Sequence, residues 1–95
     1  MKKDIFEDYV DRVTYRFGIS REQLFTKDKS RHIADARHVL YYLCSERPMS
    51  MSYIKQYMGE NGYDIAPSNI LHGVRKVESS INQDPDYITL INELK

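Results

Sequence analysis

Hydrophobic residues along the 95-residue chain recur every three or four positions, and no segment shows sustained alternation every second position. The first spacing places apolar side chains on one face of an α-helix. The pattern therefore predicts an all-α protein of five or six helices. The predicted helical segments are about 3–17, 20–25, 31–46, 50–58, 67–82 and 84–94.

The predicted boundaries carry residues that are typical of helix ends. Serine and aspartate side chains can accept hydrogen bonds from the free N–H groups of a first turn, and proline fits that turn because its missing N–H is not needed. Glycine and proline end helices. The expected starts are Ser20 (with Gln23 in a capping box), Ser30, Ser50 or Ser52, Pro67 and Asp84, and the expected ends are Gly18 and Pro48.

The segment "SNILHGVRKVESSI", residues 68–81, has two different faces. Its apolar residues are predicted to face the core: Ile70, Leu71, Val74, Val77 and Ile81. Its polar residues fall mainly on the other side. A shorter amphipathic segment and a turn with two glycines precede it, so residues 50–82 are predicted to form a helix-turn-helix.

In a DNA-binding helix-turn-helix, the second helix enters the major groove and its first residues reach base edges. Here those residues are Ser68 and Asn69. Asparagine can pair with adenine through two hydrogen bonds, and serine can contact several bases. His72, Arg75 and Lys76 follow on the same face and are predicted to lie near phosphates.

Two motifs and the last segment resemble a known family. "YRFGISREQLFTKDKSRHIADARHVLYYL" (15–43) and "NILHGVRKV" (69–77) are similar to the carboxy-terminal DNA-binding domain (domain IV) of the bacterial replication initiator DnaA. "DPDY" followed by apolar residues resembles that family's last helix. The resemblance covers about residue 13 to the end. It implies a Trp-repressor-like helical fold and binding of duplex DNA.

The resemblance also implies roles for single residues. Lys29 matches an arginine that enters the minor groove, and Arg37 matches a phosphate-contacting arginine. Met51 and Ser52 match positions that approach DNA, while Ser68 and Asn69 match two threonines at the start of the recognition helix. The complete expected DNA-binding set is Lys27, Lys29, Arg31, Arg37, Ser52, Ser68, Asn69, His72, Arg75 and Lys76.

The sequence departs from this family in the helix-turn-helix and the basic loop. Ala66 and Pro67 stand where the family has an Asp-His pair that reads bases, and the turn before them is longer. Asp28 and Asp35 replace cations. We therefore expect a different recognition sequence and weaker DNA affinity. No ATPase domain or glycine-rich phosphate loop is present, so the resemblance indicates a stand-alone domain and not an initiator.

Composition fits one globular domain over residues 1–95, with 41% hydrophobic and 29% charged residues. The 14 cations balance the 14 acids, so total charge gives no support for a nucleic-acid partner. The distribution is more informative. Residues 27–48 carry five cations and three acids, whereas residues 78–95 carry one cation and four acids.

The single cysteine excludes an internal disulfide and favours a reducing compartment. Cys44 lies in an apolar helical stripe, so it is predicted to be a core residue. No apolar run is long enough to span a membrane, and "MKKDIFEDYV" lacks the core of a signal peptide. We therefore expect a cytoplasmic protein without a membrane partner.

Other candidate sites are weaker. His32, Asp35 and His38 have helical spacing, but one helix cannot bring all three to a metal ion. The acids Glu7, Asp8 and Asp11 are better explained as a solvated face than as a nuclease site. Tyr63 is the tyrosine most expected to contact a partner. No catalytic residue, metal, cofactor or small-molecule substrate is predicted.

Two hypotheses remain. The first is a non-enzymatic protein that binds double-stranded DNA, either replication-related or a transcriptional regulator, including one encoded by a phage or mobile element. The alternative is an adaptor that keeps the DnaA-like fold and binds a replication or transcription protein. From composition alone, the basic loop 27–31 and the Arg75–Lys76 pair are also compatible with solvated surface.

Overall fold

The computed structural model describes residues 2–27 and 30–95, and this part of the chain contains six helices and no strand. The predicted all-α fold is therefore confirmed. None of the described helices is long and apolar enough to cross a membrane. The helices are α1 (Lys2–Phe17), α2 (Arg21–Leu24), α3 (Arg31–Glu46), α4 (Met51–Glu60), α5 (Pro67–Gln83) and α6 (Pro85–Leu94).

Most of the predicted helix starts form as expected, although the side chain of Ser30, the N-cap residue of α3, makes no capping hydrogen bond there. Ser20 and Gln23 make the complete capping box at α2. Ser50, not Ser52, caps α4 by accepting a hydrogen bond from the backbone N–H of Tyr53. Asp84 caps α6 in the same way, and Pro67 and Pro85 occupy first turns. The capping bonds fix where α2, α4 and α6 begin, and Pro67 favours the start of α5.

Gly18 ends α1 in the way that the sequence predicts. Its φ of 65° lies in the left-handed region, which glycine adopts without steric cost. The N–H of Gly18 donates to the carbonyl of Tyr15, and the N–H of Ile19 donates to that of Thr14. The chain therefore turns sharply from α1 towards α2.

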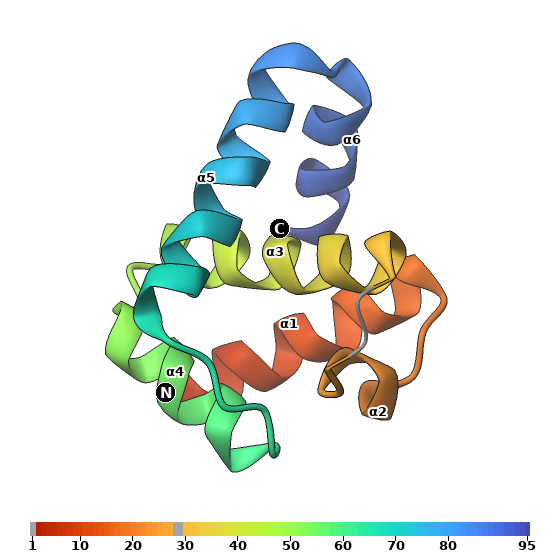
Figure 1. Ribbon diagram of the computed structural model, residues 1–95. Helices are drawn as coiled ribbons and strands as arrows, with labels where there is room; N and C mark the ends of the chain where they lie inside the picture. Colours follow the sequence, from red (N-terminus) through yellow and green to blue (C-terminus); the bar gives the residue numbers. More distant parts are fainter. Residues whose placement is uncertain (1, 28–29) are drawn as a thin grey trace.

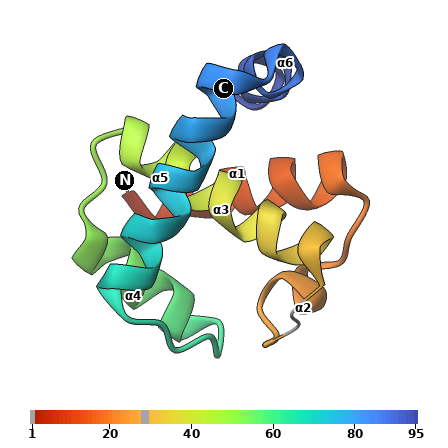
Figure 2. The same cartoon turned by 45° about the horizontal axis from the view of Figure 1, so that its top comes forward.

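Helix α3 lies at the centre of the fold, between α1 on one side and α5 on the other (Figure 1). Helix α5 crosses α3, and α6 folds back beside α5 as an antiparallel neighbour (Figures 1 and 2). Helices α2 and α4 both pack against α1. This arrangement leaves the outer face of α5 uncovered by any other described helix.

The core contains side chains from all six helices. Most of the residues that the periodicity predicts to face inward are buried, including Cys44, which has no exposed surface. Burial raises the pKa of the Cys44 thiol to about 12, as expected for an inert core residue. Leu71 is a correction, since its side chain is 38% exposed. It lies on the flank of α5, between the buried stripe and the polar face.

Helix α5 approaches α3 tightly at Gly73, which is buried. A Cβ atom at this position would lie 2.7 Å from Cδ2 of His38 and 2.9 Å from Cδ2 of Tyr41. Real Cβ atoms do not approach carbon atoms this closely. The absence of a side chain therefore lets the rings of α3 pack directly against the backbone of α5.

Candidate nucleic-acid interface

Two adjoining hollows follow the junction of α3 and α5. The first has a volume of about 220 Å³ and is lined by Lys27, Asn69 and His72, among others. The second has a volume of about 270 Å³, and its lining includes Arg31 and Lys76. His38 lines both hollows and so joins them. Six of the predicted site residues, counting Arg37 in the first hollow, therefore line one continuous part of the surface.

The other predicted residues of α4 and α5 are exposed but lie outside these hollows. Ser68, at the start of α5, is exposed and is not sealed beneath another part of the described chain. Arg75 is exposed on the same helix, and Ser52 is exposed in the first turn of α4. The polar face of α5 is thus open along its first two turns and beyond.

Arg37 is a correction to the expected set, because the fold buries it. Its side chain is 6% exposed, and Nη1 donates to the carbonyl oxygens of Leu24 at 3.1 Å and Thr26 at 2.8 Å. A buried guanidinium needs such partners. Arg37 therefore ties α3 to the end of α2 and to the α2–α3 loop (residues 25–30), instead of presenting its charge to a phosphate.

Tyr63 also differs from expectation, and Lys27 lies beside it. The Lys27 ammonium donates to the carbonyl oxygen of Asp64 and lies 4.2 Å from the centroid of the Tyr63 ring. Tyr63 itself is only 9% exposed and belongs to the core, so it is not the exposed partner contact that the sequence indicated. The predicted contact of Lys29 lies outside the described residues.

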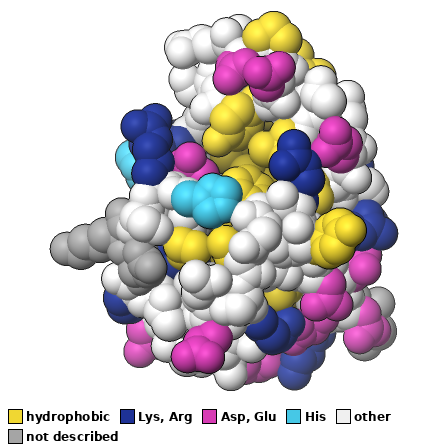
Figure 3. Space-filling model, turned by 90° about the vertical axis from the view of Figure 1, so that its right-hand side faces the viewer, with side chains coloured by type: hydrophobic (Ala, Val, Ile, Leu, Met, Phe, Trp, Pro, Cys, Tyr) yellow, Lys and Arg dark blue, Asp and Glu magenta, His cyan; other side chains and the backbone are white. Residues whose placement is uncertain are grey.

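Acidic side chains interrupt the positive charge of the site. Asp35 and Asp84 line the same hollow as Arg31 and Lys76. A neighbouring face mixes basic, acidic, histidine and hydrophobic side chains without a continuous basic stripe (Figure 3). Because opposite charges reduce the local potential, these acids weaken the attraction of this surface for a polyanion. The weaker affinity expected from the sequence stays a prediction.

The candidate metal triad does not gather at one point. A ring nitrogen of His32 lies 2.6 Å from the carbonyl oxygen of Phe17, whereas His38 packs edge-to-face with His72. Within residues 2–27 and 30–95, no group of three or more potential ligands could hold a metal ion. The two histidines are used in separate contacts.

His38, Tyr41 and Gly73 contribute to the site although the sequence analysis did not include them in the DNA-binding set. His38 joins the two hollows, and Tyr41 lies beneath the first of them with its buried hydroxyl unpartnered among the described residues. Gly73 allows both rings to approach α5. One signal was present in the sequence, since Gly73 interrupts the inward stripe between Ile70 and Val77.

The protonation of His38 should affect stability. Its pKa lies below the ordinary value of 6.5, first because of burial; Asp35 opposes this effect, and the positive charges of Lys76 and Arg37 lower the pKa further. The unfolded chain therefore binds a proton at His38 in a pH range where the folded protein does not. The neutral His38 contributes to the stability of the fold above pH 6.5, and this contribution is lost as the pH falls through the lower pKa of the folded state.

We accordingly expect a lower melting temperature at about pH 5.5 than at about pH 7.5, with a smaller difference in His38→Gln, which cannot titrate in this range. Thermal unfolding of both proteins at both pH values checks this. An equal shift in the two proteins would assign the pH dependence to other groups.

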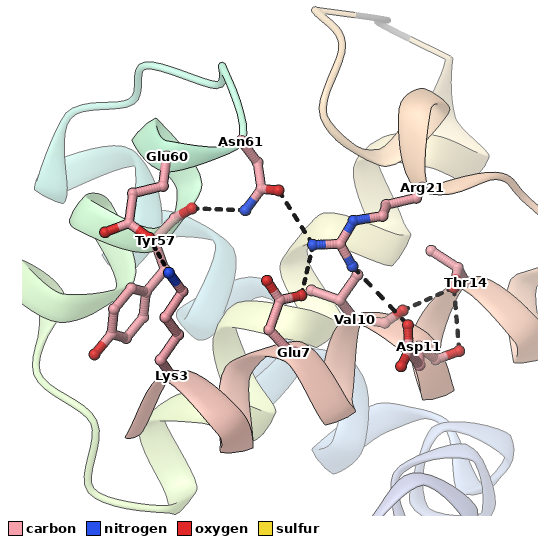
Figure 4. A network of polar contacts seen from close by, with 9 residues as sticks. All are labelled: Lys3, Glu7, Val10, Asp11, Thr14, Arg21, Tyr57, Glu60 and Asn61. Carbon is pink, nitrogen blue, oxygen red and sulfur yellow. Dashed lines mark hydrogen bonds and ion pairs between the residues drawn. The ribbon is translucent and has the colours of Figure 1, made fainter. Parts of the chain in front are cut away.

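Helix α4, the first helix of the helix-turn-helix, is held against α1 and α2 by a polar network (Figure 4). Arg21 of α2 pairs with Glu7 of α1 and donates to Oδ1 of Asn61 at 3.1 Å, just after α4. Asn61 donates in turn to the carbonyl of Tyr57 at 2.9 Å. These contacts connect α1, α2 and α4. Glu7 is thus used in an ion pair, as Asp8 is with Arg12.

The geometry defines a class of protein. Two helices joined by a turn, the second with an exposed polar face beside converging cations, form a helix-turn-helix domain of the DNA-binding type. The chain belongs to the family described as the bacterial dnaA protein helix-turn-helix, which matches residues 7–77. The resemblance predicted from the sequence is confirmed.

Two relatives are chromosomal replication initiator proteins DnaA. The one from Lachnoclostridium phytofermentans is 32% identical over 95 residues, and the one from Wolinella succinogenes is 24% identical over 90 residues. These matches cover 98% and 94% of this chain but 20% of each relative. The chain therefore spans about a fifth of the length of these relatives.

Proposed function

We propose that residues 1–95 act as one non-enzymatic unit that binds double-stranded DNA. The start of α5 enters the major groove, where Ser68 and Asn69 contact base edges. The α2–α3 loop, including Lys29, reaches the adjacent minor groove. Arg31 of α3 and His72, Arg75 and Lys76 of α5 neutralise phosphates. Ser52, at the start of α4, lies beside the sugar-phosphate backbone of the DNA.

The observation that carries this proposal is the convergence of charged and polar residues from three segments. The α2–α3 loop, the first turns of α3 and the exposed face of α5 contribute Lys27, Arg31, Asn69, His72 and Lys76 to the two adjoining hollows. Phosphate contacts fix register and orientation, while base contacts select sequence. Family membership supports the same function.

Selection from random duplexes tests the proposal. We expect the protein to enrich a preferred sequence and Asn69→Ala to relax the preference at one base pair, a change of about 1–3 kcal/mol in discrimination. The salt dependence of binding should stay the same, because no phosphate contact is removed.

Asn82→Ala is the matched control. Asn82 is also exposed on α5, but thirteen residues from Asn69, which is roughly 20 Å along a helix. This variant should keep the original preference. The proposal fails if the unaltered protein binds no duplex at low salt, or if both alanine variants select the same sequence as it does.

The biological role that we propose is replication-related or transcriptional. A second candidate is an adaptor for a replication or transcription protein, which the exposed aromatic ring of Tyr15 (90%) and the exposed side chain of Ile88 (46%) favour. Charge reversal on α5 separates the two functions. An adaptor complex survives this change, whereas DNA binding does not.

A further inference from the structure

Tyr63 lies between the two segments that the proposed function brings to DNA. It belongs to the α4–α5 turn (residues 61–66), which leads directly into α5. Its backbone N–H donates to the carbonyl of Met58 at 3.0 Å, so the residue is anchored on α4. Its ring is buried against the neighbouring segment of the chain.

Two cations lie over the Tyr63 ring, one from the α2–α3 loop and one from α3. Nζ of Lys27 is 4.2 Å from the ring centroid, and Cζ of Arg37 is 4.9 Å from it. Both distances are within the range of a cation–π interaction, which becomes stronger when water is excluded. With only 9% of Tyr63 and 6% of Arg37 exposed, little water reaches the Arg37 contact, whereas Lys27 is exposed and covers the outer side of the ring.

The same two cations hold the α2–α3 loop. Arg37 donates to the carbonyls of Leu24 and Thr26, at the start of that loop, and Lys27 belongs to the loop. Lys27 also donates to the carbonyl of Asp64, next to Tyr63. The α2–α3 loop and the α4–α5 turn are therefore joined through one aromatic ring and one hydrogen bond.

We propose that Tyr63 is a positioning residue that fixes the spacing between the α2–α3 loop and the start of α5, so that both engage the same duplex. The inference rests on the proposed function. Two binding elements held at a fixed spacing lose less entropy on binding than two independent elements, because the second element binds without a further search.

The role assigned to Tyr63 explains why this position holds an aromatic residue and not an aliphatic one. A leucine of similar burial would fill part of the space but would offer no π-face to Lys27 and Arg37. Phenylalanine would keep that face and lose only the hydroxyl. The pair of substitutions therefore separates the proposed role from general packing.

The experiment compares three proteins on the duplex enriched by selection. Relative to the unaltered protein, Tyr63→Leu should bind about tenfold more weakly, with a log–log salt slope shallower by roughly 0.9 for each phosphate that the loop no longer neutralises. It should also lose hydroxyl-radical protection in the minor groove while keeping the same preferred sequence. Tyr63→Phe should match the unaltered protein in affinity, salt slope, minor-groove protection and preferred sequence.

Unchanged slope and protection in Tyr63→Leu would overturn the inference while leaving DNA binding intact. An equal loss in Tyr63→Phe would also overturn it, because the aromatic face is retained there. If Tyr63→Leu does not fold, as judged by circular dichroism, Tyr63→Met takes its place with the same expected and contrary results.

A measurement without DNA tests the link separately from the proposed function. In thermal unfolding, Lys27→Met and Tyr63→Leu together should lower the melting temperature by less than the sum of their single effects, because each removes the same interaction. Additive shifts would overturn the link itself. If no duplex binds but the shifts are non-additive, the link stands and the proposed function fails.

Discussion

Gly73→Ala is expected to lower the free energy of unfolding by up to about 2 kcal/mol. The new methyl group would lie within 3 Å of the rings of His38 and Tyr41. Tyr41 is 1% exposed and cannot move aside without disturbing the core. Overpacking of this kind costs about 1–3 kcal/mol, which outweighs the gain of about 1 kcal/mol from the higher helix propensity of alanine.

Gly59→Ala is the matched control, and its effect should have the opposite sign. Gly59 is exposed within α4, and a Cβ atom there would meet only Oδ1 of Asp64, at 3.9 Å. Alanine should therefore raise stability by about 0.5–1 kcal/mol. Thermal or urea unfolding measures both variants. Equal effects of the two substitutions would mean that the approach of α5 to α3 is looser than described.

Reversing the charges of Arg75 and Lys76 is expected to weaken DNA binding by roughly 50-fold at about 0.1 M salt. The two cations together contribute a log–log salt slope of about 1.8, and this slope should disappear in Arg75→Glu/Lys76→Glu. Both side chains are exposed on α5, so the fold should tolerate the change. Titration of a labelled duplex at several salt concentrations gives affinity and slope together.

The control for this variant carries the same change in net charge elsewhere. Arg47 and Lys95 line a separate depression together with Tyr9 and Leu43. Arg47 follows the last residue of α3, and this depression shares no lining residue with the two hollows of the candidate site. Arg47→Glu/Lys95→Glu should change affinity only slightly. A similar loss in both variants would indicate non-specific attraction to the whole molecule.

Helix positions could be predicted well from the sequence because the determining interactions are local. Ser20, Ser50 and Asp84 cap their own helices, and the apolar spacing selects the buried face of each segment. Leu71 shows where this reasoning fails. Periodicity alone cannot decide the width of the buried stripe, which depends on how closely the neighbouring helix approaches.

The candidate site was harder to predict because its important contacts join distant segments. The cations of residues 27–37 have similar sequence surroundings, yet Arg31 is exposed and Arg37 is buried beneath a loop. Tyr63 meets Lys27 and Arg37 only after the α4–α5 turn has folded over them. Such pairs are decided by tertiary packing, for which spacing along the chain gives no signal.

The burial of Cys44 has a practical consequence. The thiol has no exposed surface and is the sole cysteine, and its thiolate form is suppressed at neutral pH. An alkylating reagent can reach the sulfur only when α3 separates from its neighbours. The rate of alkylation in native buffer therefore reports how often the folded chain opens, and no additional cysteine or label has to be introduced.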